Sequence, residues 1–256
     1  MILDETEYRD IYSKLNRYSD IDKLWREDRK RPWEFYLVVY TQRTIREVTS
    51  RFQKIKSKVP SLARKWKNGR SLMDLSRDLD FAPVMTAYLI LTSQSEWGKN
   101  SFKKMINDPR EIKDGRLRRE LIEVRDNDPI YSPEGNVVQR KRGLKGEARM
   151  KIWLDDRNIT YRREEELRAE GGKTPDFLLE KPIFLRGEEV NWIESKASFG
   201  DMKEVRKNLK NQLYSYHELF GPGLVIYWFG ILDNLPTEEG IIIDSEEVLD
   251  DHWDFD

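Results

Sequence analysis

The sequence predicts a mixed α/β protein, in which an all-helical, helix-turn-helix-like domain is followed by a domain of the order αβββαβ. Apolar residues recur at helical spacing in the first half, whereas short apolar strands alternate with helices in the second half. A turn-rich stretch over 128–136 separates the two patterns. We therefore expect one domain over 1–130 and a second over 131–256.

The first half is expected to consist of amphipathic helices. Residues 4–18 and 33–57 carry apolar side chains three and four positions apart. Ser71 suits an N-cap, and Pro83 suits the first turn of a further helix over 84–91. These two short helices and the turn between them fit a helix-turn-helix, although the second helix carries no Arg or Lys to contact bases.

The second half mixes helices and strands after a last amphipathic helix over 114–126. Strands are expected where β-branched and aromatic residues cluster between turn residues. The expected elements are a helix over 144–156, strands over 159–162, 176–179 and 190–196, a helix over 201–220, a strand over 224–229 and an edge strand over 241–243. This order predicts a mixed sheet flanked by helices.

Composition excludes several functional classes. No apolar run approaches the roughly 20 residues of a membrane span, and the N-terminus lacks a secretory pattern. The chain has no Cys, which excludes disulfides, thiolate zinc sites and cysteine nucleophiles, and two His residues leave little for a histidine-rich metal site. We expect a cytoplasmic protein without membrane contact.

Charge is distributed unevenly along the chain. Residues 1–145 carry 32 Lys and Arg against 22 Asp and Glu, and residues 146–256 carry 14 against 25, which gives about +10 and −11. The basic excess is densest over 43–70, where Glu47 is the one acidic residue, so we expect a nucleic-acid-binding domain rather than an ordinary solvated helix face. The expected phosphate contacts are Arg51, Lys54, Lys56, Lys58, Arg64, Lys65, Lys67 and Arg70.

A carboxylate–lysine pattern carries the chemistry of the second half. Asp176 begins an apolar strand, while Glu194 and Lys196 end another, and alternate residues of a strand share one face. Two carboxylates and an ammonium group at one sheet edge suit a divalent metal and the water that it activates. The alternatives are an ion pair between strands for Glu194 and Lys196, and a turn acid after the glycine pair at 171–172 for Asp176.

Helices on either side of these strands supply further candidates. Glu147 lies on the same side of its helix as Met150 and Leu154, so it is either a third metal ligand or an exposed glutamate. Gln212 and Tyr216 are one turn apart and can both address the metal or a bound phosphate. A basic stripe, which is either a phosphate track or a solvated face, is formed by Lys203, Arg206, Lys207 and Lys210.

Three strings of sequence resemble a known family. They are KTPDF at 173–177, NWIESKASFGD at 191–201 and FGPGLVIYW at 220–228. They are similar to the PD-(D/E)xK nuclease superfamily and, within it, to the TPD-motif family, which has archaeal members and a eukaryotic nuclease that partners codanin. The resemblance spans roughly residues 130–245.

The resemblance implies a restriction-endonuclease-like αβββαβ core. It implies that Asp176 and Glu194 are metal ligands and that Lys196 lies beside the attacking water. Glu147 matches the acid of the superfamily's first helix, and Gln212 with Tyr216 looks like the Gln-x-x-x-Tyr of exonuclease-like branches.

Together, these features predict a metal-dependent nuclease. We expect Mg²⁺, with Mn²⁺ as the alternative, and hydrolysis of phosphodiester bonds in DNA, with selectivity for DNA structure as a further option. The competing hypothesis is a DNA-binding regulator or adaptor whose C-terminal domain serves dimerisation or partner recruitment. A homodimer is a further expectation, as is a protein partner bound through the acidic tail over 244–256.

Overall fold

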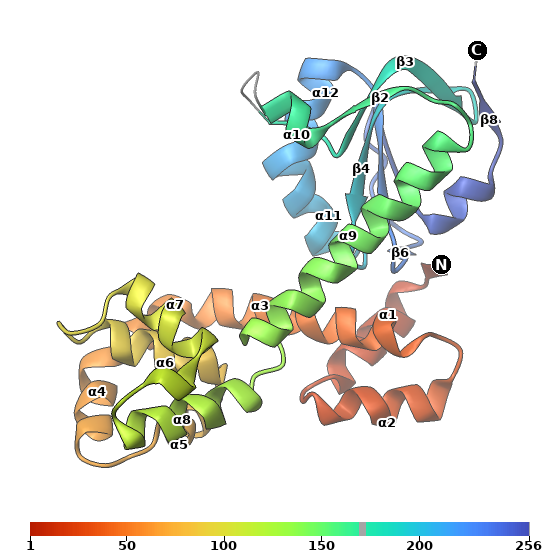
Figure 1. The fold of residues 1–256 in the computed structure, drawn as a ribbon. Coiled ribbons are helices and arrows are strands. Elements are labelled where there is room, and N and C mark those ends of the chain that lie inside the picture. Colours follow the sequence, from red (N-terminus) through yellow and green to blue (C-terminus); the bar gives the residue numbers. More distant parts are fainter. Residues whose placement is uncertain (169–172, 256) are drawn as a thin grey trace. The chain divides into compact units, whose positions relative to one another are not determined.

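The computed structural model describes residues 1–168 and 173–255 (Figure 1). The expected glycine turn at 171–172 and the last acid of the tail, Asp256, lie outside this part. The chain forms two compact units, one built from Met1–Tyr40 with Lys141–Asp256 and the other from Thr41–Arg140. The chain enters the second unit within α3 (Trp33–Lys56) and leaves it within α9 (Pro133–Asp155).

The second unit is helical. Its core joins buried leucines, isoleucines and aromatic residues of successive helices. Besides parts of α3 and α9, it contains α4 (Val59–Lys67), α5 (Leu72–Leu79), α6 (Pro83–Thr92), α7 (Lys99–Asn107), the short 3₁₀ helix η1 (Pro109–Glu111) and α8 (Gly115–Asp126). As expected, Ser71 caps α5 by accepting a hydrogen bond from the backbone N–H of Asp74 at 3.0 Å.

The two short helices that were expected to form a helix-turn-helix are present as α5 and α6, but α6 does not offer a recognition face. Val84, Ala87, Ile90 and Leu91 are buried in the core, and no residue of α6 is exposed. A helix that reads a DNA groove must present one face to solvent. The apolar run that predicted a recognition helix is therefore the centre of the helical core.

The first unit contains a mixed sheet. Its strands are β2 (Tyr161–Arg163), β3 (Phe177–Leu185), β4 (Glu188–Lys196), β5 (Gly223–Tyr227), β7 (Ile241–Ser245) and β8 (Trp253–Asp254). The order is β2-β3-β4-β5-β7, with β8 beside β3, and the pairs β4–β5 and β5–β7 are parallel. A bulge interrupts the pairing of β3 and β4 near Pro182, which has no N–H to donate.

Helices cover both faces of this sheet (Figure 1). On one face, Met150, Trp153 and Leu154 of α9 pack against alternate residues of β3, β4 and β5. The other face is covered by α11 (Met202–Asn208), a π-helical turn (Leu209–Leu213) and α12 (Tyr214–Phe220). The expected αβββαβ order is thus confirmed, with one predicted helix over 201–220 divided by the π-helical turn.

The first forty residues belong with the sheet. A core that includes Leu15, Phe35 and Phe199 joins α1 (Glu5–Lys14), α2 (Ser19–Asp28) and the beginning of α3 to the sheet unit. The strand β1 (Ile2–Leu3) also pairs in parallel with β6 (Ile231–Leu232). This grouping differs from the expected division between residues 130 and 131. The sequence did not reveal it, because contacts between residues far apart in the chain leave no local pattern.

Two segments differ from their expected form. The helix α9 begins at Pro133 rather than at residue 144, with Ser132 accepting a hydrogen bond from the N–H of Gly135 at 3.0 Å. The acidic tail is folded, since residues 246–250 form a 3₁₀ helix, η4, and β8 follows it. None of the helices in the described part has the length and hydropathy of a membrane span.

Candidate active site

Asp176 and Glu194 lie opposite each other at one edge of the sheet. The pairing of Phe177 with Ile193 makes Asp176 and Glu194 the next opposed residues, so their side chains share a face. The backbone N–H of Asp176 donates to Oε2 of Glu194 at 3.2 Å, and the N–H of Ser195 donates to Oδ2 of Asp176 at 2.8 Å. These reciprocal bonds hold the two carboxyl groups beside each other.

Lys196 completes this group from the end of β4. Its Nζ donates to Oε1 of Glu194 at 2.5 Å and to Oε1 of Gln212 at 2.7 Å. Glu194 is 5% exposed, and the side chain of Lys196 is 17% exposed. The structure thus brings together four of the predicted site residues: Asp176, Glu194, Lys196 and Gln212.

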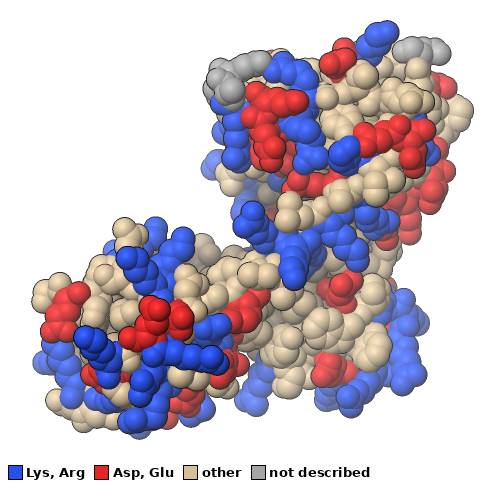
Figure 2. All heavy atoms as spheres, in the orientation of Figure 1, with Lys and Arg blue, Asp and Glu red and all other residues tan. Residues whose placement is uncertain are grey.

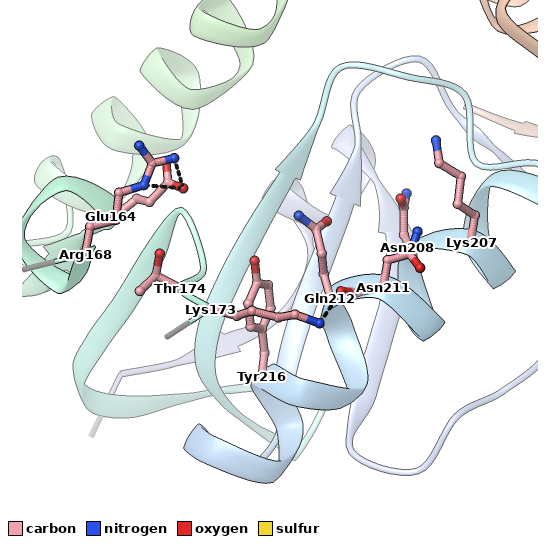
Figure 3. A pocket seen from close by; sticks show the side chains of 9 residues that line it. All are labelled: Glu164, Arg168, Lys173, Thr174, Lys207, Asn208, Asn211, Gln212 and Tyr216. Atoms are coloured by element: carbon pink, nitrogen blue, oxygen red, sulfur yellow. Dashed lines mark hydrogen bonds and ion pairs between the residues drawn. The ribbon is translucent and has the colours of Figure 1, made fainter. Parts of the chain in front are cut away.

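Tyr216 lies one turn beyond Gln212 and packs edge-on against Trp192, with ring centroids 5.4 Å apart. In Figure 3 its hydroxyl points into an opening beside Gln212 and Thr174. Gln212 lies within the π-helical turn, and such turns recur at functional sites in other proteins. The helical pattern alone gave no sign of the extra residue in this turn.

The electrostatics of the cluster reflect burial and mutual repulsion. Burial, followed by the charge of Glu194, raises the pKa of Asp176 from its ordinary 3.8 to about 7. Burial also raises the pKa of Glu194, although Lys196 opposes that shift. The pKa of Tyr216 is raised by burial and then by the charges of Glu194 and Asp176. The site therefore holds more negative charge than its own cations compensate.

Glu147 lies near this pair but is engaged elsewhere. Its charge raises the pKa of Asp176, which places it within electrostatic reach. However, Oε2 of Glu147 accepts a hydrogen bond at 2.9 Å from Nη2 of Arg163. Within residues 1–168 and 173–255, no three acidic or histidine side chains are grouped so as to hold a metal ion. The expected third ligand is thus held by an arginine that the sequence did not single out.

An open pocket of about 550 Å³ adjoins the cluster (Figure 3). Its walls come from α10 (Glu164–Leu167) with the following Arg168, from the segment before β3, and from the helical stretch over 207–216. The lining residues are Glu164, Arg168, Lys173, Thr174, Lys207, Asn208, Asn211, Gln212 and Tyr216. This pocket gives a ligand access to Gln212 and, through it, to Lys196.

Several lining residues were not expected from the sequence. Glu164 contributes to the raised pKa of Glu194 and forms an ion pair with Arg168 at 2.7 Å. Asn208 donates from Nδ2 to the hydroxyl of Tyr227 at 2.9 Å. Charged and amide residues are too common in a polar segment to mark a site without the fold, although Asn208 lies one turn before Gln212 and Asn211 lies next to it in the sequence.

The expected phosphate contacts of the helical unit divide into two groups. Arg51 donates to the carbonyl oxygens of Leu79 and Asp80, and Arg70 pairs with Asp78 at 2.6 Å, so both have structural partners. On the face drawn in Figure 2, basic side chains of this unit lie among acidic ones. The other expected contacts are exposed and form no ion pair with any described residue: Lys54, Lys56, Lys58, Arg64, Lys65 and Lys67.

The basic stripe of the sheet unit lies on α11 and the π-helical turn. Lys203, Arg206, Lys207 and Lys210 are all exposed. Lys207 contacts Glu204 at 3.3 Å and also lines the pocket. The stripe thus begins away from the pocket and reaches its wall.

The donor chemistry of the cluster fits a hard divalent cation. Such ions prefer carboxylate and carbonyl oxygens. Asp176 and Glu194 supply carboxylates at one sheet edge. Burial is the main cause of their raised pKa values, and a bound cation would stabilise both groups in the charged form. Glu147 becomes available to the same ion if Arg163 releases it.

The fold and the site define an α/β protein with a coupled carboxylate pair and a lysine at one sheet edge, beside a polar pocket. A family model described as "Protein of unknown function TPD sequence-motif" matches residues 113–247, which include every member of this cluster. The chain belongs to this TPD sequence-motif family.

Curated relatives support that membership. The protein named CDAN1-interacting nuclease 1 from Homo sapiens is 37% identical over 188 residues, which cover 69% of this chain and 67% of that protein. The protein of the same name from Mus musculus has the same identity and coverage, and that from Danio rerio is 36% identical over 67% of this chain and 60% of its own length. No solved structure matches the chain.

Proposed function

We propose that this protein is a metal-dependent nuclease of the PD-(D/E)xK type, which hydrolyses phosphodiester bonds in DNA. The observation that carries the proposal is the hydrogen-bonded cluster of Asp176, Glu194, Lys196 and Gln212 at the edge of the sheet. The relatives are named as nucleases, which supports the same reaction class.

Asp176 and Glu194 would hold the metal ion, with Mg²⁺ as the proposed ion and Mn²⁺ as the alternative. When bound, such an ion polarises a phosphate oxygen and stabilises the charge that develops during hydrolysis. Glu147 is the proposed additional ligand, because its charge already acts on Asp176.

Lys196 positions the reactants in this proposal. An ammonium group has three N–H donors, and Glu194 and Gln212 accept two of them. The third is left to hold the attacking water or a phosphate oxygen, and the positive charge favours hydroxide over water at that place. Because both partners fix the ammonium group, little reorganisation accompanies the reaction.

Gln212 and Tyr216 orient the substrate. With its Oε1 bound to Lys196, Gln212 keeps its amide N–H₂ group for a ligand in the pocket, since no described residue accepts from it. The Tyr216 hydroxyl likewise has no hydrogen-bond partner in the described part of the chain and points into the same opening. Because the pKa of this hydroxyl is raised, it acts as a neutral donor to a phosphate oxygen.

The exposed lysines and arginine over 54–67 supply affinity for the phosphate backbone in this proposal. Their contacts do not depend on base sequence, so binding should weaken steeply with salt. The buried state of α6 removes the expected route to base reading. We therefore propose recognition of nucleic-acid charge and shape rather than of sequence.

A screen of labelled substrates tests the proposed function. Single-stranded, duplex, flapped and branched DNA, with RNA counterparts, are incubated with Mg²⁺, Mn²⁺ or EDTA. The proposal predicts cleavage of a DNA substrate in a divalent metal and none in EDTA. Binding without cleavage under every condition would instead support a DNA-binding regulator.

We also propose that this protein binds a protein partner, because the relatives are named as CDAN1-interacting. The acidic tail over 244–256 stays the proposed contact, and its described part is a folded surface, since β7, η4 and β8 cover 241–245, 246–250 and 253–254. A pull-down with the CDAN1 counterpart from the same organism tests this proposal. A variant altered in β8 serves as the control for the tail.

A further inference from the structure

The cation row on α11 and the pocket beside it have the dimensions of one nucleic-acid strand. Resting on the proposed nuclease function, we infer that the substrate is a single-stranded segment or free strand end, led along this row so that one nucleotide enters the pocket. The row consists of Lys203, Arg206, Lys207 and Lys210, and the pocket is the one beside Gln212 and Tyr216.

The row has the geometry of a track for one backbone. At 100° per residue, positions 203, 206, 207 and 210 fall on one side of the helix. Seven residues of helix span about 10 Å, which matches two to three successive phosphates of one strand. Glu204 is the one acidic residue over 202–210. Its backbone N–H donates to the N-cap residue Asp201, and its carboxylate pairs with Lys207 at 3.3 Å.

The pocket continues this track. Lys207 belongs both to the row and to the pocket wall, and Asn208, Asn211 and Gln212 follow it along the same wall (Figure 3). The volume of about 550 Å³ is within the range of about 300–1,000 Å³ typical of sites for small organic ligands. A single nucleotide fits such a space, whereas a base pair with a backbone on each side does not.

The lining matches the chemistry of a nucleotide. The amide groups of Asn211 and Gln212 offer both donors and acceptors, which suits the edges of different bases without selecting one. Two cations also line the pocket: Arg168, which pairs with Glu164, and Lys173, whose Nζ donates to the carbonyl oxygen of Asn211 at 2.6 Å and keeps further N–H donors for a phosphate oxygen. Because Gln212 also contacts Lys196, a strand in this pocket places a phosphate next to the carboxylate pair.

Binding measurements in EDTA test this inference separately from cleavage. Fluorescence anisotropy of the full-length protein compares a labelled single strand with a blunt duplex of the same sequence. The expected result is at least tenfold tighter binding of the single strand at equal salt. Equal or tighter binding of the blunt duplex would overturn the inference.

A matched pair of triple variants locates the preference. Lys203→Gln with Arg206→Gln and Lys210→Gln should abolish the preference and lower the salt slope for the single strand by about 2 units, since each lost phosphate contact removes about 0.7. Lys54→Gln with Lys56→Gln and Lys58→Gln removes the same charge from the helical unit and should preserve the preference. An equal loss of preference in both variants would contradict a role for the row.

Blocking the pocket supplies an independent readout. Asn211→Trp changes an exposed side chain, so the fold should persist, and it should reduce cleavage of a single strand at least tenfold in kcat while the row still binds. Unchanged cleavage in this variant would overturn the role of the pocket. Cleavage of blunt duplex without any preference would refute this inference and leave the nuclease proposal intact, whereas a single-strand preference without cleavage would do the reverse.

Discussion

The ammonium group of Lys196 donates to Oε1 of Glu194 at 2.5 Å, from two residues further along the same strand. Residues two positions apart in a strand point to the same face, which brings both side chains together at one edge of the sheet. Because Glu194 is buried, loss of Lys196 would leave an unpaired charge in the interior, so Lys196 affects stability as well as the proposed chemistry. The two contributions can be measured separately.

Replacing Lys196 by Ala should reduce cleavage at least 100-fold and also destabilise the protein. The variant leaves a buried Glu194 carboxylate without its cation, which should lower the free energy of unfolding by about 3 kcal/mol. Kinetics in Mg²⁺ and urea unfolding measure the two effects. Lys151→Ala, which removes an exposed ion pair with Asp155, is the control. It should leave the cleavage rate unchanged and should alter the free energy of unfolding by no more than about 0.5 kcal/mol. Full cleavage by the Lys196 variant would contradict its proposed role.

Stability of the metal-free protein should depend on the protonation of Asp176. Its pKa is raised from 3.8 to about 7 on folding, so the folded state binds the proton more tightly than the unfolded state. This contribution to stability is present at low pH and is lost as pH rises through about 7. Asp176→Asn keeps an acceptor for the N–H of Ser195 and removes the charge.

In EDTA, Asp176→Asn should therefore be more stable than the unaltered protein at pH 8, by about 2 kcal/mol after allowance for the partial exposure of the side chain. Urea unfolding at pH 5 and pH 8 gives the dependence. Asp155→Asn, at an exposed position, serves as the control. An Asp176 variant whose stability follows pH as steeply as the unaltered protein would argue against a buried, repelled carboxylate.

The pairing of Glu147 with Arg163 predicts an effect on metal affinity. Glu147→Gln should raise the Mg²⁺ concentration needed for half-maximal cleavage severalfold, because it removes the proposed additional ligand. Arg163→Gln frees the Glu147 carboxylate and should lower that concentration. Isothermal titration with Mn²⁺ checks the same order without catalysis. Identical metal affinities in both variants would exclude Glu147 from the metal site.

Glu120 should be essential to the helical unit. This residue is 8% exposed, and it accepts from Nε1 of Trp66 at 2.9 Å, from the N–H of Leu72 at 3.0 Å and from Nε of Arg116 at 2.6 Å. Glu120→Ala leaves these donors without an acceptor and should cost about 3–5 kcal/mol of unfolding free energy. The exposed Glu123→Ala is the control, and urea unfolding followed by tryptophan fluorescence measures both. A loss below about 1 kcal/mol for Glu120→Ala would refute this role.

The sequence predicted local features of the fold well and long-range ones poorly. Ser71 and Asp114 were recognisable as helix starts because capping depends on a few neighbouring residues. The packing of residues 1–40 with the sheet depends on contacts between residues far apart in the sequence, which the spacing of apolar residues does not reveal. The apolar run of α6 was ambiguous for a related reason, since a buried helix and a short recognition helix look alike in sequence.

The candidate site shows the same division. Asp176, Glu194 and Lys196 could be placed together because strand alternation and the family strings agree on them. Arg163 and Glu164 could not, because their relevance follows from where β2 and α10 lie beside the carboxylate pair. The π-helical turn around Gln212 was also beyond prediction, since the four-residue spacing of the apolar residues Val205, Leu209 and Leu213 fits an ordinary α-helix as well.

The most direct test of the central claim is the cleavage rate of Glu194→Gln, measured in Mg²⁺ alongside DNA binding. Glutamine has the size of glutamate and keeps one carbonyl oxygen, which can accept from Lys196 or from the N–H of Asp176, so the fold should be retained. In this variant, the cleavage rate should fall at least 1,000-fold, while the affinity for DNA should change less than threefold. Cleavage that persists in a purified, folded variant would contradict the assignment of Glu194 to the reacting centre.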